Sequence, residues 1–391
     1  MPTRRPVRPR CPSPPVTALL GLGYTWGVSD PLLVVPEVDQ ADTPAAVPDA
    51  PLAPEERATG LGSLPGTDQR EAARTVVGEL PGFPHVPELP ARGVGADMVG
   101  RAAALLVDLA VEVWPSGYRV TARPGAQHRR GVELLARDVD ALDEALGEAG
   151  ATPRRVKTQV AGPWTLAAGV ELRNGNRVLT DPGAVAEFTE SLAEGLRGHV
   201  AELGRRTGAE VVVQLDEPTL PAVLAGSLPT PSGYGTVRAV PGADARAGLG
   251  TLVEAARGAG AAGVVVHCCH PTPPLALLGA SGADAVAVDL TALDRSGPVL
   301  DALGELWDAP TELWLGVVPS TDPDGRPELA DLARPALELA DRLGFDRARL
   351  ADRAVVTPAC GLAGASPAWA RSAMARSVEL AQAFADPPSS W

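Results

Sequence analysis

The chain has 391 residues, a length that fits one large domain or two small ones. Hydrophobic residues make up 45% of it and aromatic residues only 4%, so Ala, Val, Leu and Gly must fill the interior of a sizeable core. The formal net charge of −14 argues against a nucleic-acid backbone or an anionic membrane surface as the main partner. Since no run of 18 apolar residues exists, we predict no transmembrane helix. Three of the four cysteines lie in a region that looks like a reduced enzyme, and we expect a cytoplasmic protein.

The first 55 residues differ in composition from the rest. Residues 1–55 are rich in Pro, Ala, Asp and Val without a sustained period, which predicts a disordered tail. Arginines followed by the apolar stretch 16–22 are weakly similar to a signal peptide, but the stretch is short and prolines interrupt it. We therefore interpret this segment as a tail, or as the product of a start codon assigned too far upstream. Residues 56–391 are expected to form one folded domain.

From Ala58 onward, short β-branched runs alternate with stretches of helical period. The predicted strands are Ala58–Leu64, Tyr118–Arg123, Arg155–Ala161, Glu210–Leu215, Gly263–Cys268, Ala285–Leu290, Glu312–Val318 and Ala354–Pro358. The predicted helices between them include Gly183–Leu203, Ala245–Ala259 and Leu329–Leu343. This alternation indicates βαβ units and a parallel sheet, and eight units predict a closed (β/α)8 barrel, the TIM barrel.

An open doubly wound sheet is the alternative fold, but no G-x-G-x-x-G motif lies between a strand and a helix. The segment between the first two predicted strands contains a Pro- and Gly-rich stretch, Pro81–Gly95, interpreted as a loop. A loop of that kind near a barrel mouth can cover the site or simply pack on the surface.

Metal-ligating residue types fall at the ends of three predicted strands, where a β/α barrel builds its active site. His267 and Cys269 end one strand, and because side chains alternate they point the same way while Cys268 points oppositely. Asp289 ends the next strand and Cys360 follows the last. Two thiolates, one imidazole and one carboxylate form a tetrahedral zinc set. The alternatives are cysteines that are merely small buried hydrophobes, or a nucleophilic Cys with a His base, which leaves Cys360 unexplained.

Two further motifs place polar groups at strand ends. Asp216 and Glu217 follow the strand that begins at Glu210 and are candidate catalytic residues, and Asp216 is suited to bind a substrate ammonium group. The alternative is a helix cap or a solvated turn. Ser63, in the run Gly62–Asp68, can hold a carboxylate, although turn chemistry explains that run equally well.

In the order and spacing of these motifs, the chain resembles the C-terminal catalytic half of cobalamin-independent methionine synthase, within the uroporphyrinogen-decarboxylase-like barrel superfamily. The resemblance extends from about Gly60 to Ala375. The matching elements are Gly62–Pro65, Thr158–Pro163, Gln214–Pro218, the pair His267-x-Cys269, and Pro358–Leu362.

The resemblance implies a zinc-dependent S-methyltransferase that makes methionine from homocysteine, with methyl-tetrahydrofolate or a methylated corrinoid as donor. It implies that the metal ligands are His267, Cys269, Asp289 in place of the family's Glu, and Cys360. The homocysteine sulfur would bind the zinc, the amino group would meet Asp216, and the carboxylate would meet Ser63.

The chain departs from the family mainly on the donor side. The region Trp314–Asp322 lacks the family's proton-transferring His, and Ala167–Gly169 stands where the family has an aromatic residue that stacks on folate, with Trp164 nearby. The family's N-terminal half-barrel has no counterpart in residues 1–55. Two other hypotheses therefore stay open: a zinc-dependent transferase or lyase that acts on another thiol, and a zinc-stabilised barrel without catalytic activity.

Overall fold

Six parallel strands form the central sheet of the computed structural model, which describes residues 51–388 and residue 391. The strands are β3 (Arg155–Ala161), β5 (Glu210–Asp216), β6 (Gly263–Cys268), β7 (Ala285–Asp289), β8 (Glu312–Val318) and β9 (Ala354–Pro358). They pair in that order, and all five pairings are parallel. These six strands confirm six of the predicted ones, with ends that differ by at most one residue. The predicted tail lies outside the described residues as far as position 50.

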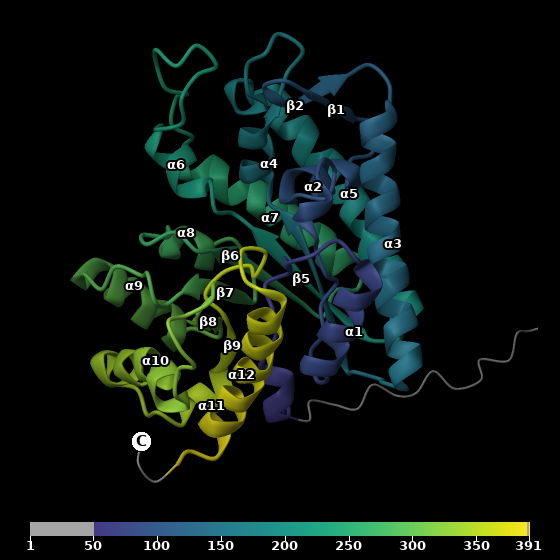
Figure 1. The fold of residues 1–391 in the computed structure, drawn as a ribbon. Coiled ribbons are helices and arrows are strands. Elements are labelled where there is room, and N and C mark those ends of the chain that lie inside the picture. The colour runs from purple at the N-terminus through teal and green to yellow at the C-terminus, as the bar shows by residue number, and fades with distance from the viewer. Residues whose placement is uncertain (1–50, 389–390) are drawn as a thin grey trace, which may run out of the picture. The chain divides into compact units, whose positions relative to one another are not determined.

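Helices connect the strands of the curved sheet (Figure 1). In the described part of the chain the helices are, in order, α1 (Gln69–Glu79), α2 (Met98–Leu105), α3 (Ala126–Ala149), α4 (Pro163–Gly169), α5 (Pro182–Thr207), α6 (Leu220–Ala225), α7 (Gly242–Gly258), α8 (Leu275–Gly279), α9 (Gly297–Asp308), α10 (Leu329–Leu343), α11 (Arg349–Arg353) and α12 (Pro367–Ala385), with short 3-10 turns at Pro54–Arg57, Pro90–Arg92 and Val178–Thr180. Several of them, such as α5, α7, α10 and α12, pack against the strands of the curved sheet. The three predicted helices are confirmed as α5, α7 and α10. Asp181 caps α5 by accepting from two backbone amides of its first turn, and Ser366 caps α12. None of the helices in this part of the chain has the length and apolar composition needed to span a membrane.

Two extended segments outside the named strands continue the parallel pairing. The segment that begins at Ala58 bridges to Val356 of β9, and Ser63 bridges to Glu88. His85 in turn bridges to Lys157 of β3, with hydrogen bonds from Val86 N to Lys157 O and from Lys157 N to Pro84 O, both 2.9 Å. Residues 58–64 and 84–88 therefore lie between the two edge strands of a mixed α/β fold whose parallel sheet is curved like part of a barrel.

The prediction of a barrel strand at Tyr118–Arg123 is wrong. Residues Gly117–Thr121 form β2, which pairs antiparallel with β1 (Ala110–Trp114) and parallel with β4 (Val170–Glu171) in a separate three-stranded sheet. Every residue of β2 is half-buried, whereas every residue of β3 is buried, as suits a strand covered on both faces. The prediction placed this strand next to β3 in the sheet. Residues 84–88, which lie inside the stretch predicted as a loop, pair there instead.

The inner face of the sheet is apolar at one end and polar at the other. The apolar end is a small cluster of buried side chains, distinct from the main hydrophobic core of the protein. It contains Phe83, Val212, Val265, Ala285, Ala287, Trp314 and Val355. Val212 lies near the start of β5, and because residues two apart share a face, Gln214 and Asp216 follow it on the same side. The polar groups therefore gather toward the carboxyl ends of the strands, the edge at which parallel α/β folds place their sites.

Candidate metal centre and active site

The carboxyl end of β6 carries two of the predicted metal ligands. His267 is the next-to-last residue of β6, and Cys269 directly follows the strand. Because residues two apart share a face of the sheet, both side chains point to the same face. His267 is 4% exposed and Cys269 is half-buried. Cys268 instead packs in the main hydrophobic core, and burial raises the pKa of its thiol to about 12. The predicted alternation is therefore observed, and Cys268 behaves as a small core residue.

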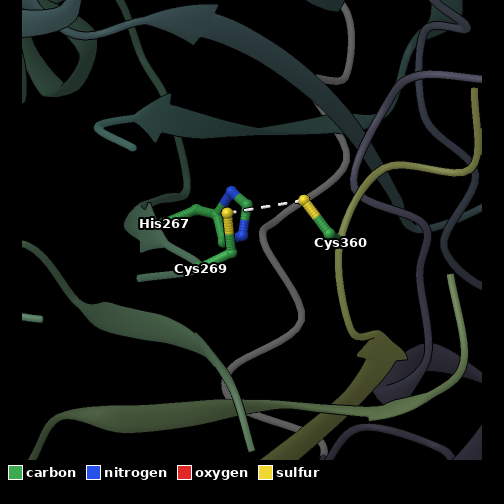
Figure 2. A group of neighbouring side chains, drawn as sticks. All are labelled: His267, Cys269 and Cys360. Carbon is green, nitrogen blue, oxygen red and sulfur yellow. Dashed lines mark hydrogen bonds between the residues drawn. The ribbon is translucent and has the colours of Figure 1, made fainter. Parts of the chain in front are cut away.

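Cys360 joins this pair from the end of β9, two residues beyond the strand. Its Sγ lies 3.4 Å from Sγ of Cys269, although 91 residues separate them in sequence. The ligand atoms of His267, Cys269 and Cys360 all lie within 4.8 Å of one another, and Figure 2 shows them converging from two sides. In a tetrahedral site with Zn–S bonds of about 2.3 Å, two thiolates lie about 3.8 Å apart, so this spacing needs little adjustment to hold one ion.

The imidazole of His267 is oriented for metal ligation. Its Nδ1 lies 2.7 Å from Oδ1 of Asp216, which is itself only 3% exposed. Since a carboxylate accepts hydrogen bonds, Nδ1 carries the proton and Nε2 keeps its lone pair. Nε2 is buried and has no hydrogen-bond partner among the described residues. A buried nitrogen lone pair without a partner, next to two thiols, fits a soft metal cation such as zinc.

The two thiols influence one another directly. A hydrogen bond in which the Cys269 thiol donates to a thiolate on Cys360 lowers the pKa of Cys360. The same contact, together with burial, raises the pKa of Cys269, because a second negative charge would lie beside the first. The pair therefore holds one negative charge readily, and a cation is needed to hold both as thiolates.

Ser63 lies beside this group, as the prediction of a substrate-binding serine requires. A side chain at Gly361 would collide with Ser63 Oγ, so the glycine after Cys360 leaves room for the hydroxyl. The backbone of the two segments is also joined, because Leu362 N donates to Ser63 O at 2.8 Å. Ser63 is therefore held next to the third metal-ligand candidate, and its role toward a substrate stays a prediction.

Glu88 is a candidate functional residue that the sequence analysis missed. It pairs with Ser63 in an isolated bridge, and its carboxylate lies 3.2 Å from the guanidinium of Arg101. Burial raises the pKa of Glu88, and the negative charge of Asp216 adds to this, while Arg101 opposes it. Arg101 is held in turn by buried Asp138. Because Glu88 lies in a Pro-rich stretch without strand periodicity, no local pattern marks it.

Glu217 lies next to Asp216 in sequence, but its side chain serves a different part of the fold. Its carboxylate accepts hydrogen bonds from the backbone amides of Trp164 and Thr165, both at 2.9 Å, and from the Thr165 hydroxyl at 2.8 Å. It therefore satisfies the free N–H groups at the start of α4. Burial raises the pKa of Glu217 to about 8. This geometry favours the helix-capping alternative, and the catalytic role of Glu217 stays a prediction.

Asp289, the predicted fourth ligand, is not one of the three residues that converge. Its Oδ1 accepts from the Thr291 amide at 2.9 Å, from the Thr291 hydroxyl at 2.6 Å and from the Ala292 amide at 3.1 Å. These bonds form a turn at the end of β7 and occupy one carboxylate oxygen. Its assignment as a zinc ligand stays a prediction.

The donor side of the site shows no aromatic platform from α4. Trp164 is 4% exposed, and its indole Nε1 donates to Ala245 O at 2.8 Å, so the ring packs toward α7. Ala167 and Ala168 are buried in α4. The segment after β8 forms hydrogen bonds to the start of α12. Pro319 O accepts from the indole N–H of Trp369, and the Asp322 carboxylate accepts from the backbone amide of Ser366.

Comparison with curated proteins finds no match. The family model for the catalytic domain of cobalamin-independent synthase matches residues 57–383, which is well over half of the chain. The chain belongs to this cobalamin-independent synthase family. The resemblance stated from the motifs is thereby confirmed.

Two solved structures are similar in fold to this family member. One is a B12-independent methionine synthase from Shewanella sp. W3-18-1 in complex with selenomethionine, with 14% sequence identity, a TM-score of 0.52, and coverage of 85% of this chain and 97% of that one. Another, from Listeria monocytogenes, is described as a candidate vitamin-B12-independent methionine synthase, with 16% identity, a TM-score of 0.51, and coverage of 83% and 96%. At these identities the likeness concerns the fold.

Membership of the cobalamin-independent synthase family indicates, in general terms, a methyltransferase of the methionine-synthase kind. The family is in general zinc-dependent, and the group of His267, Cys269 and Cys360 is one that can hold a metal ion.

Proposed function

We propose that this family member transfers a methyl group to the thiol of homocysteine, forming methionine, at a zinc site made by His267, Cys269 and Cys360. The observation that carries the proposal is the convergence of these three ligand atoms within 4.8 Å at the carboxyl ends of two strands. Family membership supports methyl transfer to homocysteine in general terms.

The scaffold in this proposal is a complete (β/α)8 barrel. The bridges of Ala58, Ser63 and His85 support it, because they carry parallel pairing from β9 through two extended segments to β3. Closure of this kind would bring β6 and β9 to opposite sides of one barrel mouth. That arrangement agrees with ligands that meet in space although their strands are not neighbours in the sheet.

Zinc in this site would keep a bound thiol deprotonated near neutral pH and so make it a nucleophile. The chain's own residues would hold and orient: Cys269 and Cys360 offer thiolates, His267 offers Nε2, and Asp216 fixes the imidazole through Nδ1. Thiolate ligands favour zinc over magnesium or calcium. Three protein ligands leave a position for the substrate sulfur, and Asp289 is the proposed weak fourth ligand that the substrate would displace.

Homocysteine also carries an ammonium and a carboxylate group, and the site offers partners for both. Asp216 and Glu88 are buried carboxylates close enough for the charge of Asp216 to raise the pKa of Glu88, and a substrate ammonium would relieve that repulsion. The Ser63 hydroxyl, held beside Gly361, would donate to the substrate carboxylate. These assignments place the amino-acid end of the substrate next to the thiol ligands.

The methyl donor in the proposal is methyl-tetrahydrofolate or a methylated corrinoid. The substrate sulfur forms the new bond to the methyl carbon as the bond from that carbon to the donor breaks. The electron pair leaves with the donor, which takes up a proton if the leaving atom is a nitrogen. Because Trp164 packs toward α7 and no His lies in Trp314–Asp322, the donor side favours no particular donor.

A zinc-dependent transferase or lyase acting on another thiol is the second candidate function. The observation that favours it is the contrast between a well-formed metal-ligand group and a donor side without the aromatic residue and the His that the resemblance predicts. Reaction with other small thiols in preference to homocysteine would support it.

The decisive experiment is a thiol titration of the cobalt(II)-substituted protein, recorded in the visible and near-ultraviolet. We expect homocysteine to intensify or shift the sulfur-to-metal charge-transfer bands, and we expect Cys269→Ala and Cys360→Ala to abolish this response. Cys268→Ala is the matched control, since this neighbouring thiol packs in the core away from the group. If cobalt binds and no thiol alters the spectrum, the site is closed and structural, and the methyltransferase proposal fails.

A further inference from the structure

The chain contains a single lysine. Of its 34 lysine and arginine residues, 33 are arginine and only Lys157 is lysine. Its side chain is fully buried in the middle of β3, although a long cationic side chain is almost never fully buried unless it is paired. Because arginine serves as the cation everywhere else, this position needs what a guanidinium does not provide, a compact ammonium with three donors around one atom.

The contacts of Lys157 orient two glutamine side chains. Lys157 Nζ donates to Oε1 of Gln159 at 2.9 Å and to Oε1 of Gln214 at 2.8 Å. An ammonium group can only donate, so both amides must turn their oxygen toward it and their NH2 group away. The NH2 group of Gln214 then donates to Leu61 O at 3.0 Å and to Asp216 Oδ1 at 2.7 Å.

The same oxygen of Asp216 receives the hydrogen bond from His267 Nδ1 at 2.7 Å. A directed chain of hydrogen bonds therefore runs from Lys157 through Gln214 to Asp216, where it meets the metal-ligand candidate. The ammonium holds the oxygen end of the Gln214 amide, while Leu61 O and Asp216 Oδ1 accept at its NH2 end. Without the ammonium, the buried Oε1 loses its donor, and the amide that donates to Asp216 is held at one end only. The orientation of His267 thus depends on a charge three side chains away.

Burial and the neighbouring charges act on Lys157 in opposite directions. Burial lowers the pKa of Lys157 to about 7, while the charges of Asp216 and Glu88 oppose that effect. His85, on the neighbouring segment, is also buried, and burial together with Lys157 lowers its pKa well below the ordinary value. With His85 neutral, the charge that opposes these two carboxylates comes from Lys157 and from Arg101, which lies 3.2 Å from Glu88.

We propose that Lys157 is a positioning residue for the metal centre, which acts through Gln214 on the Asp216 carboxylate and so on the imidazole of His267. This inference rests on the zinc site of the proposed function. Lys157 donates to neither the ligand atoms nor the substrate partners; it holds the Gln214 amide by its oxygen and so fixes the donor that reaches Asp216.

The test is the zinc affinity of the purified full chain, measured by competition with a chromophoric chelator. Removal of an outer partner of a ligating His typically costs 10–100-fold in metal affinity, and we expect Lys157→Met and Gln214→Met each to weaken zinc binding about tenfold. We expect the double variant to be no weaker than either single variant, because both residues act along one chain of bonds.

Thr158→Val is the matched control. Thr158 is the next residue of the same strand and is equally buried, but its hydroxyl bonds His199 Nε2 at 2.8 Å on the other face. It should lose a buried hydrogen bond without losing zinc affinity. If Lys157→Met binds zinc as tightly as Thr158→Val, the positioning role is refuted and the zinc site stands. If the wild-type chain binds no zinc, the proposed function fails and this inference fails with it.

A second measurement needs no substitution at Lys157. In protein labelled with ¹³C at the lysine Cε, Lys157 gives the only lysine side-chain resonance. We expect zinc to shift this resonance in the wild type and in Thr158→Val, and to leave it unmoved in Gln214→Met. A resonance that does not respond to zinc in the wild type, when zinc is shown to bind, would overturn the inference.

Discussion

Replacing Glu217 with glutamine separates a structural from a catalytic role for this carboxylate. Its two oxygens accept three hydrogen bonds of 2.8–2.9 Å from Trp164 and Thr165. Glutamine has the same shape but keeps one accepting oxygen, and its NH2 group faces donors that it cannot satisfy. A buried donor left without an acceptor costs roughly 1–3 kcal/mol, so we expect Glu217→Gln to lower the free energy of unfolding by that amount.

The pH dependence of stability provides a second readout for the same variant. Burial raises the pKa of Glu217 from 4.5 to about 8 in the folded state. Between these values the folded chain holds a proton that the unfolded chain releases, so this group makes stability fall as pH rises, by at most about 1.4 kcal/mol per pH unit. Glu217→Gln should remove this contribution.

The assay combines urea unfolding, followed by circular dichroism, with the rate of methyl transfer per folded molecule. A general acid or base contributes roughly 10²–10⁴-fold to rate. We expect the rate of the folded variant to stay within about threefold of the wild-type rate, which is a much smaller decrease than the loss of a general acid or base would cause. Thr165→Val keeps both backbone donors to Glu217 and removes the hydroxyl, which also accepts from Thr219 N at 3.4 Å, and it should show a smaller loss of stability. A rate about 100-fold lower with unchanged unfolding free energy would refute the capping interpretation.

Two further predictions concern the metal centre, and a third concerns the buried Lys157. Asp216→Asn should weaken zinc binding by about 10–100-fold, because it removes the charge that holds His267, whereas Asp284→Asn, at the opposite end of the sheet, should not. Asp289→Asn should weaken zinc binding in the absence of a thiol if Asp289 is the fourth ligand; equal affinity by chelator competition would exclude it as a ligand. The folded-state pKa of Lys157, about 7, lies below its ordinary 10.5, so the unfolded chain binds more protons between these values and stability should gain from this group as pH rises. Urea unfolding from pH 7 to 10 should show that gain in the wild type and not in Lys157→Met, and parallel curves would contradict it.

Local patterns in the sequence were sufficient for most of the elements and for part of the site. Six strands and three helices were predicted within a few residues of their observed ends, because the pleat and the helical turn impose periods that show in any window of a few residues. The same alternation placed His267 and Cys269 on one side of β6 and Cys268 on the other. These are properties of a single strand, and they need no knowledge of its neighbours.

Only the tertiary structure decided which segments pair with one another in the sheets. Gly117–Thr121 has a strand-like pattern but pairs in the small sheet, while residues 84–88, with two prolines, lie beside β3. Strand propensity does not specify which edge a segment joins, because that depends on packing against distant residues. The 3.4 Å contact between Cys269 and Cys360 was foreseen only through the predicted barrel and the family resemblance.

The three-dimensional contacts also decided which of two adjacent carboxylates faces the metal group. Asp216 bonds His267, whereas Glu217 bonds the start of α4, and nothing in the dipeptide distinguishes them. Lys157 is visible in the sequence as the only lysine, yet its direction of hydrogen bonding through Gln214 exists only once three strands are side by side. Side-chain type and spacing are local quantities, but hydrogen bonding of a buried group depends on every element that excludes water from it.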